Sequence, residues 1–125
     1  MKVLIIDDHA PTRALISTWI RSLATEIREI SNGRDGLAVC RTFQPDLVTL
    51  DLRMRLMDGF DTLQALRAEF PELKIVIVTQ ADFPDLRRKA AELGAAFFIP
   101  KDELRMLRWY LERELQLQQR SACVG

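Results

Sequence analysis

The stretch Val3–Asp8, VLIIDD, sets a pattern that the rest of this chain repeats. Four apolar residues suit a strand that is buried on both faces, and two carboxylates follow directly where that strand would end. Four further short runs continue the pattern, namely Ile27–Ile30, Leu47–Leu50, Ile75–Val78 and Ala95–Ile99. Arg28 and Glu29 interrupt the first of these four, so we expect Ile27–Ile30 to form an edge strand.

Helical patterns follow each of these runs, because apolar residues recur there at spacings of three and four. The five stripes are Leu15, Ile16, Trp19, Ile20 and Leu23; Leu37 and Cys40; Leu63, Leu66 and Phe70; Leu86, Ala90 and Leu93; and Leu104, Leu107, Leu111 and Leu115. Pro11 and Pro84 stand where first-turn prolines belong, and Gly94 is placed to end the fourth helix. Strands that alternate with helices predict one α/β domain, a (βα)5 unit whose parallel sheet carries helices on both faces.

The length and charge of the chain narrow its function. Its 125 residues fit one domain, which can bury a core without disulfide or metal staples. Its 18 Lys and Arg residues balance 18 Asp and Glu residues, which argues against a dedicated nucleic-acid binder. No apolar run approaches the roughly 18 residues of a membrane span, and Cys40 and Cys123 show no metal or redox spacing. We therefore expect a cytoplasmic protein that binds neither membrane nor nucleic acid directly.

Polar side chains follow the predicted strands at their carboxyl ends, where open α/β sheets bind ligands. Asp7 and Asp8 follow the first strand and Asp51 the third, while Thr79 closes the fourth and Lys101 follows the fifth. Three neighbouring carboxylates repel one another unless a cation joins them, and Mg²⁺ prefers such oxygen ligands. A carboxylate beside a metal can also act as a nucleophile and form an aspartyl phosphate, whose charge Mg²⁺ and a lysine would offset.

Each of these residues also has an ordinary structural interpretation. Asp7 and Asp8 could cap the following helix, and Asp51 could form a turn. Thr79 could be a β-branched strand residue, and Lys101 could be a solvated surface residue. Their joint position at one edge of the sheet is what favours the chemical interpretation.

Together these residues resemble the receiver domains of response regulators, the phosphate-accepting modules of two-component signalling (the CheY-like superfamily). The resemblance extends from Lys2 to about Leu115 and lies in the stretches VLIIDDHAPTR, PDLVTLDLRMRLMDGFDTLQAL, IVIVTQAD and ELGAAFFIPKD. It implies a doubly wound, flavodoxin-like fold with a five-stranded parallel sheet in the order 2-1-3-4-5. We expect the receiver domain to span residues 1–118, with residues 119–125 as a flexible C-terminal tail.

The resemblance implies a catalytic or switching role for four residues. Asp51 corresponds to the phosphoacceptor, assisted by Thr79 and Lys101. Thr79 also corresponds to the switch hydroxyl. Phe98 corresponds to the aromatic residue whose rotamer couples the phosphate to a face made by helix 4, strand 5 and helix 5.

The resemblance also implies a Mg²⁺ site. Asp8 corresponds to a carboxylate that binds the metal directly, and Asp7 to one that helps through water. Asp51 itself and the backbone carbonyl of Arg53 would supply the other protein ligands.

Three positions depart from the family pattern. Arg55 follows Met54 where the family commonly has proline, and Gln80 follows the switch hydroxyl where a small residue is usual. Lys101 precedes Asp102 rather than proline, so a cis bond is not expected there. These changes point to altered kinetics more than to lost acceptor chemistry.

Two surface features keep open interpretations. Arg87, Arg88 and Lys89 on the fourth helix form either a solvated face or a partner-docking face. Trp109 and Tyr110 are adjacent, so both cannot face the core fully. Trp109 is then either packed at the edge of the core or an exposed anchor of the kind interfaces favour.

The implied function is that of a signalling domain rather than an enzyme with its own substrate. A histidine kinase or histidine phosphotransfer protein would supply the phosphoryl group, and the domain would catalyse its own phosphorylation and dephosphorylation. An output protein or domain would bind through helix 4, strand 5 and helix 5, and a homodimer stays open. The alternative is a phosphorylation-independent pseudo-receiver that serves as an interaction module. Arg55 and Gln80 lend this alternative some weight, whereas the intact set of Asp8, Asp51, Thr79 and Lys101 argues against it. The chain either acts alone or is the receiver part of a longer regulator.

Overall fold

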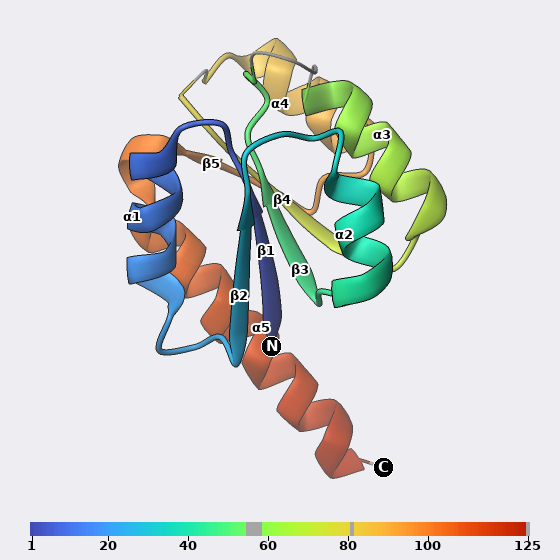
Figure 1. Cartoon of the computed structure of the whole chain (residues 1–125). Coiled ribbons are helices and arrows are strands. Elements are labelled where there is room, and N and C mark those ends of the chain that lie inside the picture. The colour runs from blue at the N-terminus through green and yellow to red at the C-terminus, as the bar shows by residue number, and fades with distance from the viewer. Residues whose placement is uncertain (55–58, 81, 125) are drawn as a thin grey trace.

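The computed structural model describes residues 1–54, 59–80 and 82–124, with the backbone alone for residues 121–124. Strands and helices alternate along these residues (Figure 1). The elements are β1 (Lys2–Ile6), α1 (Ala10–Ile20), β2 (Glu26–Ile30), α2 (Gly36–Phe43), β3 (Leu47–Leu50), α3 (Gly59–Glu69), β4 (Lys74–Thr79), α4 (Pro84–Glu92), β5 (Phe97–Pro100), the 3₁₀ turn η1 (Lys101–Glu103) and α5 (Arg105–Val124). The predicted elements are therefore all present, and the strand bounds differ only at their ends.

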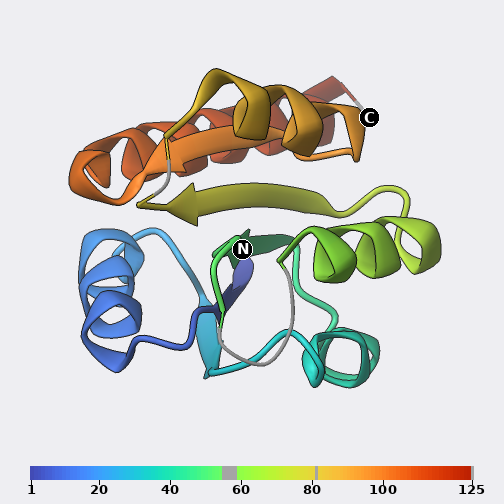
Figure 2. The ribbon, with the colours of Figure 1, turned by 90° about the horizontal axis from the view of Figure 1, so that it is seen from above.

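The five strands form one parallel sheet in the order β2-β1-β3-β4-β5, which confirms the predicted topology. β2 lies at one edge, as its interrupted apolar run predicts. Helix α1 lies on the opposite side of the sheet from α2 and α3 (Figure 2). This order places β1 and β3 side by side, so the residues that follow these two strands meet at one edge of the sheet.

Two apolar layers hold the helices to the sheet. One layer packs α2, α3 and α4 against alternate strand residues such as Leu4 and Leu50. The other layer packs α1 and α5 against the opposite strand residues, among them Ile5 and Leu47. The near-continuous apolar strands are explained by this double cover, because each strand buries side chains on both faces.

The predicted core stripe of α1 is too wide. Ile16 and Ile20 are buried against the sheet, whereas Leu15 is 50% exposed and Trp19 is 38% exposed. Residues four apart lie on one face of a helix, and the residue before each is turned about 100° away from that face. Leu15 and Trp19 therefore point outward although they fit the same apolar pattern.

Of the two adjacent aromatic residues on α5, the tyrosine is the buried one and the tryptophan is exposed. Tyr110 is buried and stacks on Phe97 with ring centroids 5.3 Å apart, while Trp109 is 52% exposed. Trp109 still lies near Phe97, at 6.2 Å between ring centroids, and the Arg113 guanidinium lies over the Trp109 ring at 5.7 Å from its centroid. The buried side of the helix is thus made by Leu107, Tyr110 and Leu111.

The predicted punctuation is largely confirmed. Pro11 and Pro84 lie in the first turns of α1 and α4, and Gly94 has a φ of +102° directly after α4. Gln44 also adopts a positive φ, of 53°, at the end of α2, which the sequence did not indicate. The described residues contain no cis peptide bond, as expected for Lys101–Asp102.

Helix α5 reaches Val124 and extends beyond the body of the sheet in Figure 1. The boundary at residue 118 and the flexible tail after it stay predictions. Among the described helices, none combines the length and the apolar character needed to cross a membrane.

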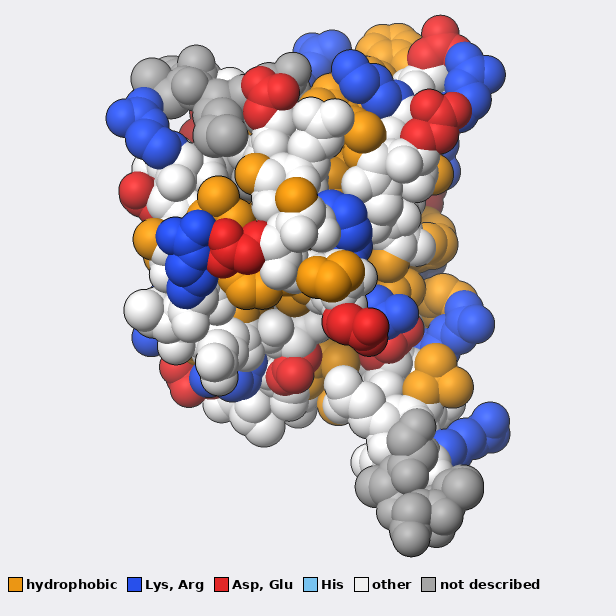
Figure 3. Space-filling model, turned by 90° about the vertical axis from the view of Figure 1, so that its right-hand side faces the viewer, with side chains coloured by type: hydrophobic (Ala, Val, Ile, Leu, Met, Phe, Trp, Pro, Cys, Tyr) orange, Lys and Arg blue, Asp and Glu red, His pale blue; other side chains and the backbone are white. Residues whose placement is uncertain are grey.

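Charged side chains alternate in sign on the face drawn in Figure 3. One ion pair joins two helices: the Arg41 guanidinium on α2 donates two hydrogen bonds of 2.6 Å to the Glu69 carboxylate on α3. On α4, Arg87 pairs with Asp82 and Arg88 with Asp85. These pairings favour the solvated interpretation for much of the predicted basic face.

Candidate functional site

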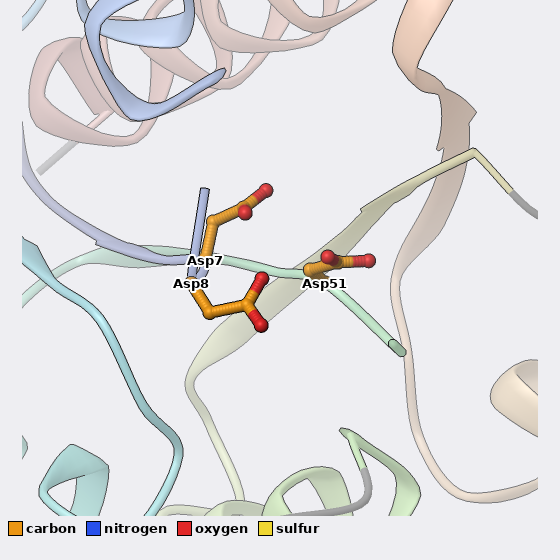
Figure 4. Close-up of side chains that lie close together, drawn as sticks. All are labelled: Asp7, Asp8 and Asp51. Carbon is orange, nitrogen blue, oxygen red and sulfur yellow. The ribbon is translucent and has the colours of Figure 1, made fainter. Parts of the chain in front are cut away.

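Three carboxylates meet at the edge of the sheet where β1 and β3 end. Asp7 and Asp8 follow β1 and Asp51 follows β3, and carboxylate oxygens of all three lie within 4.8 Å of one another. Figure 4 shows the Asp8 carboxylate turned toward Asp51. Asp7 is 1% exposed and Asp51 is 3% exposed, so this negative charge is largely removed from water. Such a cluster is costly without a cation among the oxygens.

Lys101 supplies one positive charge to this cluster. Its Nζ lies 3.0 Å from Asp7 Oδ2 and 3.2 Å from Asp51 Oδ2, so one ammonium bridges the two buried carboxylates. Burial opposes the charge of Lys101, but the two carboxylates outweigh it and hold its pKa above the usual value. Lys101 is therefore a permanent cation beside Asp51.

Asp7 carries the cost of this burial. Desolvation raises the pKa of its carboxyl above the usual value, while the His9 amide, which donates a 2.8 Å hydrogen bond to Oδ1, and Lys101 oppose the shift. A raised carboxyl pKa means that folding stability is full below the ordinary pKa and is lost as pH rises through the folded value. The charged form of Asp7 therefore destabilises the metal-free fold at neutral pH.

Replacing Asp7 by asparagine tests this cost. We expect Asp7→Asn to raise the unfolding temperature of the metal-free protein by roughly 2–5 °C near neutral pH, because a buried carboxylate is replaced by a neutral amide. The gain should shrink as the pH falls through the raised pKa of the native Asp7 carboxyl and should be gone below the ordinary carboxyl pKa. Thermal unfolding followed by circular dichroism in a metal chelator measures both values. The control is Asp61→Asn, an exposed change on α3. A loss of stability in Asp7→Asn at neutral pH would contradict the interpretation.

Thr79 lies at the end of β4 and is fully buried. Its hydroxyl has no hydrogen-bond partner among the described residues. A buried polar group without a partner costs free energy, so this hydroxyl is available to donate to a group that enters the site. Thr79 also lines a pocket of about 250 Å³ together with the charged residues of the site. The pocket lining is Asp8, His9, Asp51, Arg53, Thr79, Gln80 and Lys101. The buried Thr49 and Thr62 hydroxyls also lack a partner among the described residues, but neither lines the pocket.

Arg53 and Gln80 also line this pocket. The Arg53 amide donates a 3.1 Å hydrogen bond to Asp51 Oδ1, and the Arg53 side chain is exposed. Gln80 is exposed at the rim of the pocket, and its effect on kinetics stays a prediction. Arg55 lies outside the described residues.

A family model described as "Response regulator receiver domain" matches residues 3–110 of this chain. The chain is a member of the response-regulator receiver family. The matched range covers β1 from its second residue, the other four strands in full, and all the site residues named above.

Individual relatives agree with the family assignment. The receiver is 38% identical over 105 residues to "Protein-glutamate methylesterase/protein-glutamine glutaminase 2" of Nitratidesulfovibrio vulgaris, with 81% of this chain and 28% of that protein covered. It superposes on the response regulator receiver domain protein (CheY-like) from Methanospirillum hungatei with a TM-score of 0.85 at 21% identity, covering 96% and 97% of the two chains. The receiver spans between about a quarter and half of the length of the curated relatives it matches.

The acidic cluster of this receiver suits a divalent cation. The Mn²⁺-bound form of response regulator Rcp1 is a structural neighbour, with a TM-score of 0.74, 18% identity and coverage of 86% of this chain and 88% of that chain. That similarity shows the fold alone. The donor set of the receiver itself carries the fit, since Asp7, Asp8 and Asp51 offer hard oxygen ligands within 4.8 Å and Lys101 offsets only part of their charge.

One contact of the receiver's aromatic residue was not predicted. Phe98 is buried in the layer under α4, and the Arg87 guanidinium lies over its ring at 4.8 Å from the centroid. Arg87 Nε also donates a 2.6 Å hydrogen bond to Asp82 Oδ1, before α4 begins. The connection after β4 is thus linked through Arg87 to the aromatic residue of β5. No sequence pattern indicated this link, because Arg87 and Phe98 belong to different elements.

Proposed function

We propose that this receiver accepts a phosphoryl group on Asp51, in a Mg²⁺-dependent step, from a phosphohistidine of a histidine kinase or histidine phosphotransfer protein. One observation carries the proposal: the buried Asp51 carboxylate lines a pocket, has oxygens of two further carboxylates within 4.8 Å, and lies 3.2 Å from the Lys101 ammonium. This combination joins a nucleophile, a set of metal ligands and a fixed cation at one point.

The geometry supports an in-line transfer. A carboxylate oxygen of Asp51 would form a bond to phosphorus while the bond from phosphorus to the imidazole nitrogen of the donor breaks, leaving the donor histidine neutral. Lys101 offsets charge on the phosphoryl oxygens, because its pKa keeps it protonated. Asp7, Asp8, Asp51 and the carbonyl of Arg53 would hold Mg²⁺, which would supply further positive charge to the same oxygens.

Thr79 would complete the phosphorylated state. Its buried hydroxyl lacks a partner among the described residues, and a phosphoryl oxygen on Asp51 would accept its hydrogen bond. Water that enters the same pocket past Gln80 would hydrolyse the acyl phosphate, so the domain would also catalyse its own dephosphorylation. Apart from the phosphoryl donor and water, this cycle needs no further substrate.

The output of the cycle would be a change on the face formed by α4, β5 and α5. Movement of Thr79 toward the phosphate would shift the connection after β4, and Arg87 would pass this shift to Phe98. An output protein, an output domain or a second copy of the chain would read the changed face. We place this exchange in the cytoplasm, together with the proposed donors.

Incubation with a small phosphodonor tests the proposal. In the presence of Mg²⁺ and acetyl phosphate, intact-mass spectrometry should show the addition of one phosphoryl group, and a chelator should abolish it. Peptide mapping should place the added group on Asp51. A native protein that forms no adduct with acetyl phosphate or beryllofluoride would refute the proposal and favour the phosphorylation-independent interaction module.

Phe98 tests the proposed output. We expect Phe98→Leu to form the beryllofluoride adduct as the native protein does but to lose at least half of the change in amide hydrogen exchange over α4 and β5, because the ring under Arg87 is gone. Phe70→Leu, a change in the same apolar layer at the end of α3, is the control and should keep the native response. A native response in Phe98→Leu would show that the signal does not pass through this ring.

A further inference from the structure

Arg13, in the second turn of α1, reaches back to the strand that carries the acidic pair. Its Nη1 donates a 2.7 Å hydrogen bond to the backbone carbonyl of Asp7, and its Nε lies 3.4 Å from Glu29 Oε1 on β2. The Arg13 side chain is only 18% exposed, although Arg is usually a surface residue. One guanidinium thus connects α1, the end of β1 and the edge strand β2.

The carbonyl that Arg13 holds belongs to the peptide between Asp7 and Asp8. The peptide after Asp8 is held as well, because the His9 amide donates to Asp7 Oδ1 at 2.8 Å. The next peptide is held by the His9 carbonyl, which accepts a 3.1 Å hydrogen bond from the Arg13 amide. The Asp7 amide is fixed in turn by a 3.2 Å hydrogen bond to the Ile30 carbonyl. With both flanking peptides held, the direction in which the Asp8 side chain leaves the backbone is fixed.

We propose that Arg13 is a positioning residue for the metal site: it sets the direction of the Asp8 carboxylate toward Asp51, and Glu29 keeps the guanidinium aimed at the Asp7 carbonyl. The inference rests on the proposed function, because it assumes that the acidic cluster binds Mg²⁺. A hydrogen bond from a charged donor is stronger and more directional than one between neutral groups, which suits this task.

Because Arg13 is charged, its removal can act on Mg²⁺ binding in two ways: through the lost charge and through the lost positioning of Asp8. A guanidinium next to a divalent site repels the incoming cation, so neutralising Arg13 should tighten Mg²⁺ binding if charge alone matters. If Arg13 positions Asp8, the same change should weaken binding instead. Glu29 reduces the repulsion by placing a negative charge beside the guanidinium. The two explanations therefore predict opposite signs.

The test measures Mg²⁺ affinity of the purified full chain by isothermal titration calorimetry. We expect Arg13→Met to raise the Mg²⁺ dissociation constant about tenfold, as is typical when a group that orients a metal ligand is removed. Arg13→Lys keeps the charge and can reach the carbonyl with one donor, so it should recover part of the affinity. Arg21→Met, at the other end of α1, removes the same charge away from the site and should leave the affinity within about twofold of native.

Two further measurements separate positioning from a general structural role. At saturating Mg²⁺, the rate of Asp51 phosphorylation by acetyl phosphate should return close to native in Arg13→Met. The unfolding temperature of the same variant without metal should not fall in proportion to its loss of Mg²⁺ affinity. If Arg13→Met does not fold, Arg13→Gln takes its place with the same predicted sign. Binding by the neutral variant that equals or exceeds native binding would overturn the inference and leave the proposed function standing. A native chain that binds no Mg²⁺ would overturn both.

Discussion

Asp51→Asn is expected to abolish the phosphoryl adduct, with a rate at least about 100-fold below native, because an amide oxygen is a far weaker nucleophile than a carboxylate. The change conserves shape, and the Arg53 amide can still donate to the side-chain oxygen at position 51. The variant should therefore keep its fold while losing its chemistry. Intact-mass spectrometry after incubation with acetyl phosphate and Mg²⁺ measures the adduct.

The matched control for this change is Asp61→Asn. Asp61 lies on α3, is exposed and makes no part of the pocket, so its replacement should leave the adduct unchanged. An adduct that persists in Asp51→Asn would show that another residue accepts the phosphoryl group, and Asp8 would be the first residue to examine. Loss of the adduct in both variants would indicate a general effect of charge rather than removal of the acceptor.

Gly59→Ala is expected to have the largest effect on stability among the changes considered. A Cβ at this position would lie 2.6 Å from the Asp51 carbonyl oxygen and 2.9 Å from the Leu52 carbonyl carbon, and it would also press on Leu52 Cα. These are backbone atoms beside the proposed phosphoacceptor, and the Gly59 amide already donates a 3.2 Å hydrogen bond to the Leu52 carbonyl. We expect a loss of roughly 2–3 kcal/mol in the free energy of unfolding, because the segment after β3 must shift to make room. Urea unfolding followed by Trp fluorescence measures this loss.

Gly36→Ala is the control for Gly59→Ala. A Cβ on Gly36, at the start of α2, would meet the end of the Ile6 side chain at 3.3 Å, and a side chain can give way where a backbone cannot. Alanine is also the better helix former, so the net change should stay within about 1 kcal/mol of zero. A Gly59→Ala variant as stable as Gly36→Ala would show that the segment after β3 adapts easily. Slower phosphorylation in folded Gly59→Ala would show that the position of Asp51 depends on this close approach.

The positions of the proposed metal ligands and acceptor could be predicted because these residues stand directly after strands. Asp7, Asp8 and Asp51 follow β1 and β3, and parallel strands bring their carboxyl ends to one edge of the sheet. Lys101 was placed by the same reasoning, and its contacts with Asp7 and Asp51 agree with it. Strand order and residue type were enough here, since the backbone itself carries these side chains to the site.

The contacts that hold and connect the site could not be predicted in this way. The hydrogen bond from Arg13 to the Asp7 carbonyl and the position of Arg87 over Phe98 both join side chains to elements that the sequence pattern does not pair. A long, flexible side chain such as arginine can reach many partners, and packing between elements selects one of them. The unpartnered hydroxyl of Thr79 is likewise visible only once its surroundings are known.

The sequence by itself determined the order of strands and helices, the topology that this order allows, and the residue types that gather at the ends of β1, β3, β4 and β5. Periodicity and position along the chain are local properties that can be seen in the sequence. Parallel strand pairing then brings the residues that follow neighbouring strands close together in space. Only the tertiary structure decided which side of each helix is buried, as Ile16 and Leu15 on α1 show. The same holds for the charges, since the zero net charge of the chain conceals a buried acidic cluster that one lysine only partly offsets. Burial and mutual distance set the cost of each charge, and both depend on how elements far apart in the sequence pack together.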